Sequence, residues 1–312
     1  MRILRQLIGA IRKIVEFWTP SGIADRKYKW QGAGFAGDGS ESEGAKSAKR
    51  YFLGLNIDEQ EPELRNIIEY FKNDDNPITM FPGNFTKKYR IDYDKACKMN
   101  YVFYENKKMF FPKGWSTASI RRYYDELRME QDEDSPHRYE TKDFIVKNGD
   151  VIADIGAAEG IWALKYVEIA KKIYLFESNP AWIKALQKTF EPWKEKVVIV
   201  NKYISDVNDN TNITLDCFFE NKIINFVKAD IEGAEVKLVN GGQKILASQK
   251  DIKLLLATYH LKNAAEELKE RLEKLEFTTE YSKGYMIVWW QNVEKETANP
   301  YIRRGVIRAK KV

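Results

Sequence analysis

From residue 150 onward, short apolar runs alternate with amphipathic stretches, and this alternation constrains the fold more than any other feature of the sequence. The stretches repeat apolar residues every three or four positions, which is the period of a helix with one buried face. The runs read VIADI at 151–155, IYLFE at 173–177, VVIV at 197–200, NFVKAD at 225–230 and KLLLATY at 253–259. Apolar strands that alternate with helices predict an α/β fold, namely a doubly wound, Rossmann-like parallel sheet with helices on both faces.

Two further runs follow, FTTEY at 277–281 and YMIVWW at 285–290. Only a short stretch separates them, so they are expected to pair as a hairpin and to place an antiparallel strand at one edge of the sheet. The sequence VIRAKK near the C-terminus is expected to form a tail.

The first 140 residues lack this alternation, and their composition divides them into segments. Residues 1–18 carry apolar side chains at helical spacing with basic residues among them. This pattern predicts an amphipathic helix that packs on the protein body or a partner, or else lies on an anionic membrane surface. Residues 19–50 are rich in glycine and serine, as loops and linkers are. Residues 51–140 are interpreted as an accessory or lid region, and residues 141–312 as the α/β domain.

Within the accessory region, helices are expected at 58–73 and 116–130, because apolar residues recur there at helical spacing. Pro62 suits the first turn of the earlier helix. A hairpin is expected at 101–112, where two apolar runs flank a turn at Asn106.

Composition excludes several classes of protein. The chain has 312 residues, a formal net charge of +5, and no apolar stretch that approaches the ~20 residues of a membrane span. Its two cysteines, Cys97 and Cys217, are too few for a disulfide scaffold and fit a reducing compartment such as the cytoplasm. Its two histidines, His137 and His260, exclude a metal site made of three histidines. The small net charge gives no reason to expect a nucleic-acid partner.

Ligands of doubly wound sheets bind at the carboxyl ends of the strands, so the residues that end each strand are the candidate site residues. The first strand ends in Asp154, the second in Glu177, the fourth in Lys228 and Asp230, and the fifth in His260. The turn after Asp154 consists of Ile155, Gly156, Ala157, Ala158, Glu159 and Gly160. Its first glycine permits a tight turn and its second permits close packing of the following helix.

Spacing and charge at these strand ends favour a nucleoside that carries no phosphate. Glu177 follows Asp154 by 23 residues, close to the ~20 expected of an acid that binds ribose hydroxyls. Asp154 and Glu159 would repel a pyrophosphate, whereas they and the acidic segment around Asp230 and Glu232 suit the ammonium and sulfonium groups of S-adenosylmethionine. Glu159 has the alternative interpretation of an acid paired with a helix N-terminus.

Over roughly residues 145–290, the sequence resembles the FkbM family of S-adenosylmethionine-dependent methyltransferases. DIGAAEG resembles the family's D-x-G-A-N-x-G loop, FESNP its F-E-P-N-P, and TLDCFF its T-L-D-D-F/L. KADIEGAE at 228–235 resembles K-x-D-V/I-E-G-A-E, the most specific of these motifs, and ISD at 204–206 resembles the segment near the adenine. The chain departs from the pattern at Ala158-Glu159, where the family often has Asn and a hydrophobic residue, and at Cys217, which replaces an Asp.

The resemblance implies a seven-stranded methyltransferase sheet and methyl transfer to a hydroxyl, on a sugar of a cell-surface polysaccharide or on a glycosylated metabolite. It places the adenine near Ser205 and Asp206, the ribose on Glu177 beside Ser178, and the methionine near Gly156. The other expected cofactor-binding residues are Asp154, Ala157, Ala158, Glu159, Gly160 and Asp230.

A sugar hydroxyl is a poor nucleophile, so a base within hydrogen-bond reach would assist the transfer. Asp230 and His260 are the candidates. Lys228 shares a strand face with Asp230, because side chains alternate along a strand, and is the third candidate catalytic residue. The alternative is that Asp230 is simply paired with Lys228. His137 is expected to be a surface histidine, with a lid residue as the alternative.

No metal is expected, although Asp206, Asp230 and Glu232 could converge on Mg²⁺ as an alternative. The predicted enzyme is cytoplasmic, peripheral at the inner membrane if residues 1–18 lie on lipid, and its acceptor is a glycan or a small molecule. Methylation of a polyketide or peptide metabolite is a second interpretation, and a non-catalytic scaffold that keeps the cofactor fold is a third. The sequence carries no signal of oligomeric state.

Overall fold

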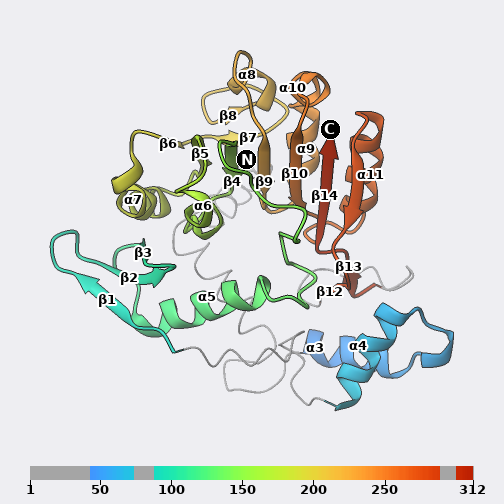
Figure 1. Ribbon diagram of the computed structural model, residues 1–312. Helices are drawn as coiled ribbons and strands as arrows, with labels where there is room; N and C mark the ends of the chain where they lie inside the picture. The colour runs from blue at the N-terminus through green and yellow to red at the C-terminus, as the bar shows by residue number, and fades with distance from the viewer. Residues whose placement is uncertain (1–42, 74–87, 289–299, 312) are drawn as a thin grey trace, which may run out of the picture. The chain divides into compact units, whose positions relative to one another are not determined.

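A computed structural model describes residues 43–73, 88–288 and 300–311 of the chain (Figure 1). It divides into two compact units: the first holds the described residues among 1–80 and 287–302, and the second those among 81–286 and 303–312. The helix expected at 1–18, the linker expected at 19–42 and the end of the run 285–290 lie outside the described residues. None of the helices in the described part of the chain has the length and hydropathy that a membrane crossing requires.

The first unit contains two helices, α3 (Glu43–Leu53) and α4 (Pro62–Asn73), with a 3-10 turn η1 (Ile57–Glu59) before the second. The helix expected at 58–73 is therefore confirmed. The loop predicted over 19–50 is wrong for residues 43–50, which are helical. Ala48 and Phe52 lie one turn apart and are fully buried against α4, where the rings of Phe52 and Phe71 stack at 5.2 Å. Burial of this apolar face outweighs the low helix propensity of Gly44 and Ser47.

The second unit is built on a seven-stranded sheet with the order β11-β14-β10-β9-β4-β5-β6. Figure 1 shows β6 to β14 side by side in this order. The strands are β4 (Val151–Ile155), β5 (Lys172–Phe176), β6 (Val197–Val200), β9 (Phe226–Ala229), β10 (Ile252–Ala257), β11 (Thr278–Tyr281) and β14 (Val306–Lys311). β4, β5, β6, β9 and β10 run parallel to their neighbours within this group. The doubly wound α/β fold is thus confirmed.

The antiparallel strand of the sheet is β14, and it lies one place in from the edge, paired with both β10 and β11. The predicted hairpin of 277–281 with 285–290 is therefore wrong, and so is the predicted tail. β14 buries four consecutive residues, Val306–Ala309, whereas β11 alternates between exposed and half-buried positions. A segment that is buried on both faces is most stable between two strands, and a half-polar segment suits the edge.

Helices cover both faces of the sheet, and the side chains of each strand alternate between the two resulting cores. Ile152 and Phe226 belong to one core, and Ala153 and Val227 to the other. The first face carries α6 (Ile161–Tyr166) and α7 (Pro180–Thr189). The second carries α8 (Leu215–Phe218), α9 (Glu235–Asn240), α10 (Gln243–Ser248) and α11 (Ala264–Lys274).

Residues 88–130 belong to the same unit and pack on the first face. They form a three-stranded antiparallel sheet and the helix α5 (Thr117–Glu130), whose Tyr123 ring lies 5.5 Å from Trp182 of α7. The strands are β1 (Ile91–Asp94), β2 (Met99–Tyr104) and β3 (Lys107–Phe110). The predicted hairpin and helix are confirmed, while β1 was not predicted. The shorter elements are η2 (Glu191–Trp193), β7 (Tyr203–Ile204), β8 (Asn212–Ile213), β12 (Met286–Ile287) and β13 (Ile302–Arg303).

Candidate functional site

In the turn after β4, the backbone of Gly156 lies directly against the backbone of Asp230 at the end of β9. Gly156 has a φ of +72°, and a Cβ at this position would lie 2.2 Å from the carbonyl oxygen of Asp230. Gly160 has a φ of +75° and lies against the side chains of Leu186 and Phe190, where a Cβ would come within 2.8 Å. Only glycine satisfies both the left-handed backbone and the close approach at these two positions.

Glu177 fixes the same turn from the end of β5. Its Oε2 accepts a hydrogen bond from the amide of Ala158 at 2.9 Å, and its Oε1 accepts one from the amide of Asn179 at 2.7 Å. Ser178 lies between these contacts and is half-buried. A carboxylate has about four lone-pair sites, so Glu177 keeps capacity for further donors such as hydroxyl groups.

Asp154 and Lys228 form a buried ion pair between adjacent strands. They are direct neighbours in the register of β4 and β9, and Lys228 Nζ lies 3.0 Å from Asp154 Oδ1. Burial raises the pKa of Asp154 to about 6, although the Lys228 charge opposes this. Burial acts against the charge of Lys228 as well, but the Asp154 carboxylate outweighs it and raises the Lys228 pKa. At neutral pH both groups are charged and the pair is neutral.

This pair changes two expectations from the sequence. Lys228 is paired with Asp154 and not with Asp230, and a protonated, buried ammonium cannot serve as a base. Glu159 is 5% exposed, and its Oε2 accepts a hydrogen bond from Tyr123 OH. Asp154 is neutralised and Glu159 faces α5, so the negative charge at this edge comes from Glu177, Asp230 and Glu232.

Asp230, directly after β9, accepts contacts from three side chains. Tyr139 OH donates to Oδ2 at 2.7 Å, His137 Nε2 lies 3.4 Å from the same oxygen, and His260 Nε2 lies 3.4 Å from Oδ1. Burial acts against its ionisation, but the hydrogen bond from His137 and the charges of His260, His137 and Lys228 outweigh it and hold the Asp230 pKa well below its usual value. Asp230 is therefore a fixed anion with a side chain that is 19% exposed.

His137 is buried, with 1% of its surface exposed, so the prediction of a surface histidine is wrong. The segment that carries His137 is hydrogen-bonded to Arg308 of β14 and to Ser282, which precedes β14 in the chain. Arg308 donates to the carbonyls of Arg138 and Tyr139 at 2.7 and 2.8 Å, and Ser282 Oγ donates to the carbonyl of Pro136. These bonds bring His137 and Tyr139 to Asp230. No local pattern marks Tyr139 as a site residue, because its partner Asp230 follows a strand far along the chain.

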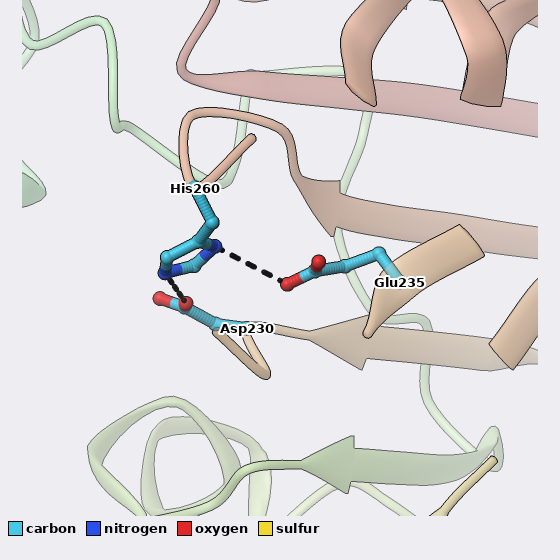
Figure 2. Close-up of side chains that lie close together, drawn as sticks. All are labelled: Asp230, Glu235 and His260. Carbon is cyan, nitrogen blue, oxygen red and sulfur yellow. Dashed lines mark ion pairs between the residues drawn. The ribbon is translucent and has the colours of Figure 1, made fainter. Parts of the chain in front are cut away.

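His260 follows β10 and lies between two carboxylates (Figure 2). Its Nε2 faces Asp230, and its Nδ1 lies 3.4 Å from Glu235 Oε1. Glu232 Oε2 lies 3.6 Å from Nε2 but is largely exposed. Burial lowers the pKa of His260, yet the hydrogen bond and charge of Glu235, with Asp230 and Glu232, outweigh it and raise the pKa to about 9. Glu235 was not predicted as a site residue, although it closes the motif KADIEGAE.

The group Asp230, Glu235 and His260 brings three ligand-type atoms within 4.8 Å of one another. Each nitrogen of His260 already faces a carboxylate, as Figure 2 shows, and the imidazolium itself compensates their charge. The alternative Mg²⁺ site also included Asp206, which does not belong to this group. Ser205 donates to Asp206 Oδ1 at 3.2 Å, and both residues lie against Gly241, at the C-terminal end of α9.

A hollow of about 630 Å³ lies between the β2–β3 hairpin and residues 188–193. Lys107, Lys188 and Trp193 are among the residues that line it, and none of the predicted site residues does. The candidate site is therefore the strand edge that carries Gly156, Glu177, Asp230 and His260.

Comparisons with known proteins give remote structural likenesses. The chain is similar to a methyltransferase FkbM from Methylobacillus flagellatus, with 13% identity, 63% of this chain and 61% of that chain covered, and a TM-score of 0.43. It thus spans about three fifths of that structure. It is also similar to TYW2 of M. jannaschii in complex with AdoMet, with 15% identity, 72% and 90% covered, and a TM-score of 0.39. An rRNA methylase from Streptococcus thermophilus has 15% identity, 54% and 90% covered, and a TM-score of 0.35.

No protein-family profile matches the sequence, and no curated protein does. The likeness to the FkbM family therefore remains a resemblance carried by the motifs.

Proposed function

We propose that this protein is an S-adenosylmethionine-dependent methyltransferase that acts on a hydroxyl group. One observation carries the proposal: the carboxyl edge of the sheet joins a glycine turn held by Glu177 to an ionised Asp230 that is flanked by two histidines. The first half of this arrangement suits a nucleoside, and the second suits a hydroxyl that must lose a proton.

The residues of the turn offer hydrogen-bond acceptors and open backbone of the type that S-adenosylmethionine needs. Glu177 can accept from ribose hydroxyls, and Gly156 and Ala157 expose backbone at the point where two strand ends meet. Glu177, Asp230 and Glu232 would repel a pyrophosphate and attract a cationic ligand. S-adenosylmethionine supplies a methyl group on a sulfonium, which is already activated for displacement.

The chain's own task is then to orient the acceptor hydroxyl. Asp230 Oδ1 lies 3.4 Å from the buried His260 Nε2, and the Asp230 side chain is 19% exposed, so a hydroxyl can donate to this carboxylate. The low pKa of Asp230 makes it a weak base, whereas neutral His260 is a strong one. His260 is accordingly the final proton acceptor: the hydroxyl donates its proton toward Asp230, and the proton passes from Asp230 to His260 Nε2.

Calorimetry with S-adenosylmethionine tests the cofactor. We expect binding by the wild type, at least tenfold weaker binding by Glu177→Ala, and unchanged binding by the exposed control Glu220→Ala. NAD serves as the competing ligand. Binding of neither ligand would leave the scaffold interpretation, and binding of NAD but not of S-adenosylmethionine would contradict the proposed cofactor.

Turnover tests the assignment at Asp230 and His260. We propose a sugar hydroxyl of a glycan or glycosylated metabolite as the acceptor, since Asp230 and His260 can together bind a hydroxyl and take its proton. Incubation of labelled cofactor with glycan extracts identifies the methylated product. Asp230→Asn and His260→Gln should each lower turnover by ~10²-fold or more. Asp251→Asn, at an exposed position, is the control. Retained turnover in both site variants would remove general-base catalysis.

A further inference from the structure

We propose that Glu235 is a positioning residue, which holds the proton on His260 Nδ1 and so presents Nε2 to Asp230, the carboxylate that binds the acceptor hydroxyl. The catalytic part of this inference rests on the proposed function, while the state of the imidazole does not.

The position of Glu235 is fixed from both sides. It is the first residue of α9 and 1% exposed. Its Oε1 accepts a hydrogen bond from the amide of Ile231 at 2.9 Å and lies 3.4 Å from His260 Nδ1 (Figure 2). Because the carboxylate is buried and bonded to the backbone, it cannot turn toward water. An imidazole held this way keeps its proton on Nδ1, and Nε2 becomes the atom that exchanges a proton.

The other groups around His260 cannot replace Glu235. Asp230 faces Nε2 and is itself shared with His137 and Tyr139. Glu232 also faces Nε2, at 3.6 Å, but its side chain is 65% exposed and water screens its charge. The neighbouring Tyr259 ring lies 4.1 Å away, and burial raises its pKa well above the usual value, so it stays neutral. Glu235 is thus the buried carboxylate on the Nδ1 side.

The chain offers a direct measurement, since it has two histidines. Nuclear magnetic resonance of ¹⁵N-histidine-labelled protein gives two pairs of ring-nitrogen signals, one pair for each imidazole, which His137→Gln assigns. We expect His260 to titrate near pH 9 and to carry its proton on Nδ1 when neutral. Glu235→Gln keeps an oxygen for the Ile231 amide but removes the charge, and should lower the midpoint by about one pH unit or more. Glu235→Asp restores the charge and should recover part of the shift.

Glu232→Gln is the matched control, because it removes an exposed glutamate that touches the same ring. It should move the midpoint by less than about 0.3 pH unit. A Glu235→Gln midpoint that stays within that range, or a neutral His260 protonated on Nε2, would overturn the inference. The amide spectrum of each variant shows whether that variant is folded. If Glu235→Gln does not fold, the midpoint measured for Glu235→Asp tests the inference in its place.

Activity gives the second readout. In the wild type, kcat should rise with pH to a plateau above about 9, since the neutral imidazole is the base. In Glu235→Gln, this rise should move to lower pH by the same amount as the resonance midpoint, with an unchanged KM for the cofactor. A resonance shift without any methyl transfer in the wild type would contradict the proposed function alone. A kcat profile that does not follow the resonance midpoint would contradict the catalytic role of Glu235.

Discussion

Several buried charged side chains around the candidate site have a polar or charged partner close by. Asp154 is neutralised by Lys228, Glu159 accepts from Tyr123, and His260 lies between Asp230 and Glu235. An ion buried without a partner costs several kcal/mol, which explains why these side chains occur in sets. The buried pair formed by Asp154 and Lys228 therefore has a structural role beneath the candidate site.

Removing one member of that pair should be more harmful than removing both. Lys228→Met leaves the Asp154 carboxylate buried and unpaired, and should lower the free energy of unfolding by about 3–5 kcal/mol. The double variant Asp154→Leu/Lys228→Met should lose much less, because no buried charge remains. Urea unfolding of both variants checks this. Equal losses in the single and double variants would show that the ion pair is not what the single substitution disrupts.

The raised pKa of His260 also makes stability depend on pH. The folded-state pKa of about 9 exceeds the ordinary value of 6.5, so protonation stabilises the folded state fully below pH 6.5. This contribution, on the order of 3 kcal/mol, is lost as pH rises through about 9. The difference in unfolding free energy between wild type and His260→Gln should therefore shrink between pH 6 and pH 9.5. A constant difference over this range would contradict the shifted pKa.

At the scale of elements, the turn between β4 and α6 stores backbone strain. Ala158 has a φ of +47°, in the left-handed region, and its amide is held there by Glu177. A non-glycine residue costs about 1–2 kcal/mol in this conformation.

Ala158→Gly should consequently raise the free energy of unfolding by about 1 kcal/mol, since glycine adopts a positive φ freely. Ala163→Gly is the matched control: this alanine lies inside α6, where glycine costs about 1 kcal/mol. The two substitutions should shift the thermal midpoint in opposite directions. A loss of stability in both would show that Ala158 is not strained.

At the scale of the whole molecule, a strand near the end of the chain completes a site that begins near its middle. Arg308 of β14 is buried and bonds to the backbone of the segment that carries His137 and Tyr139. The insertion of β14 beside β10 thus positions side chains that meet Asp230. The candidate site depends on the sheet being fully assembled, and not on the β4–β9 half alone.

The basic N-terminal segment is a separate feature at this scale, and we propose that it contacts an anionic membrane surface. A variant that lacks residues 1–18 should lose most of its sedimentation with anionic vesicles. The wild type should bind the same vesicles less tightly as the salt concentration increases. Cofactor binding should be the same in both. Equal partitioning of the two proteins would exclude a membrane role for this segment.

The sequence by itself determined most strands of the sheet and which polar residues stand at their ends. Apolar runs and helical periods are local signals, so β4 and β6 begin and end as predicted, and Asp230 and His260 were placed at one edge. The strand period also put Lys228 on one face. A period assigns a side chain to a face but does not name its neighbour, which is why the sequence leaves the pairing of Lys228 with Asp230 as an open alternative.

Only the tertiary structure decided the partners. The register of β4 and β9 gives Lys228 to Asp154, and the place of β14 in the sheet brings in His137 and Tyr139. The approach of α9 to the end of β10 sets Glu235 against His260. Each of these contacts joins segments far apart in the chain, and it forms because buried polar groups need partners once the apolar faces have packed.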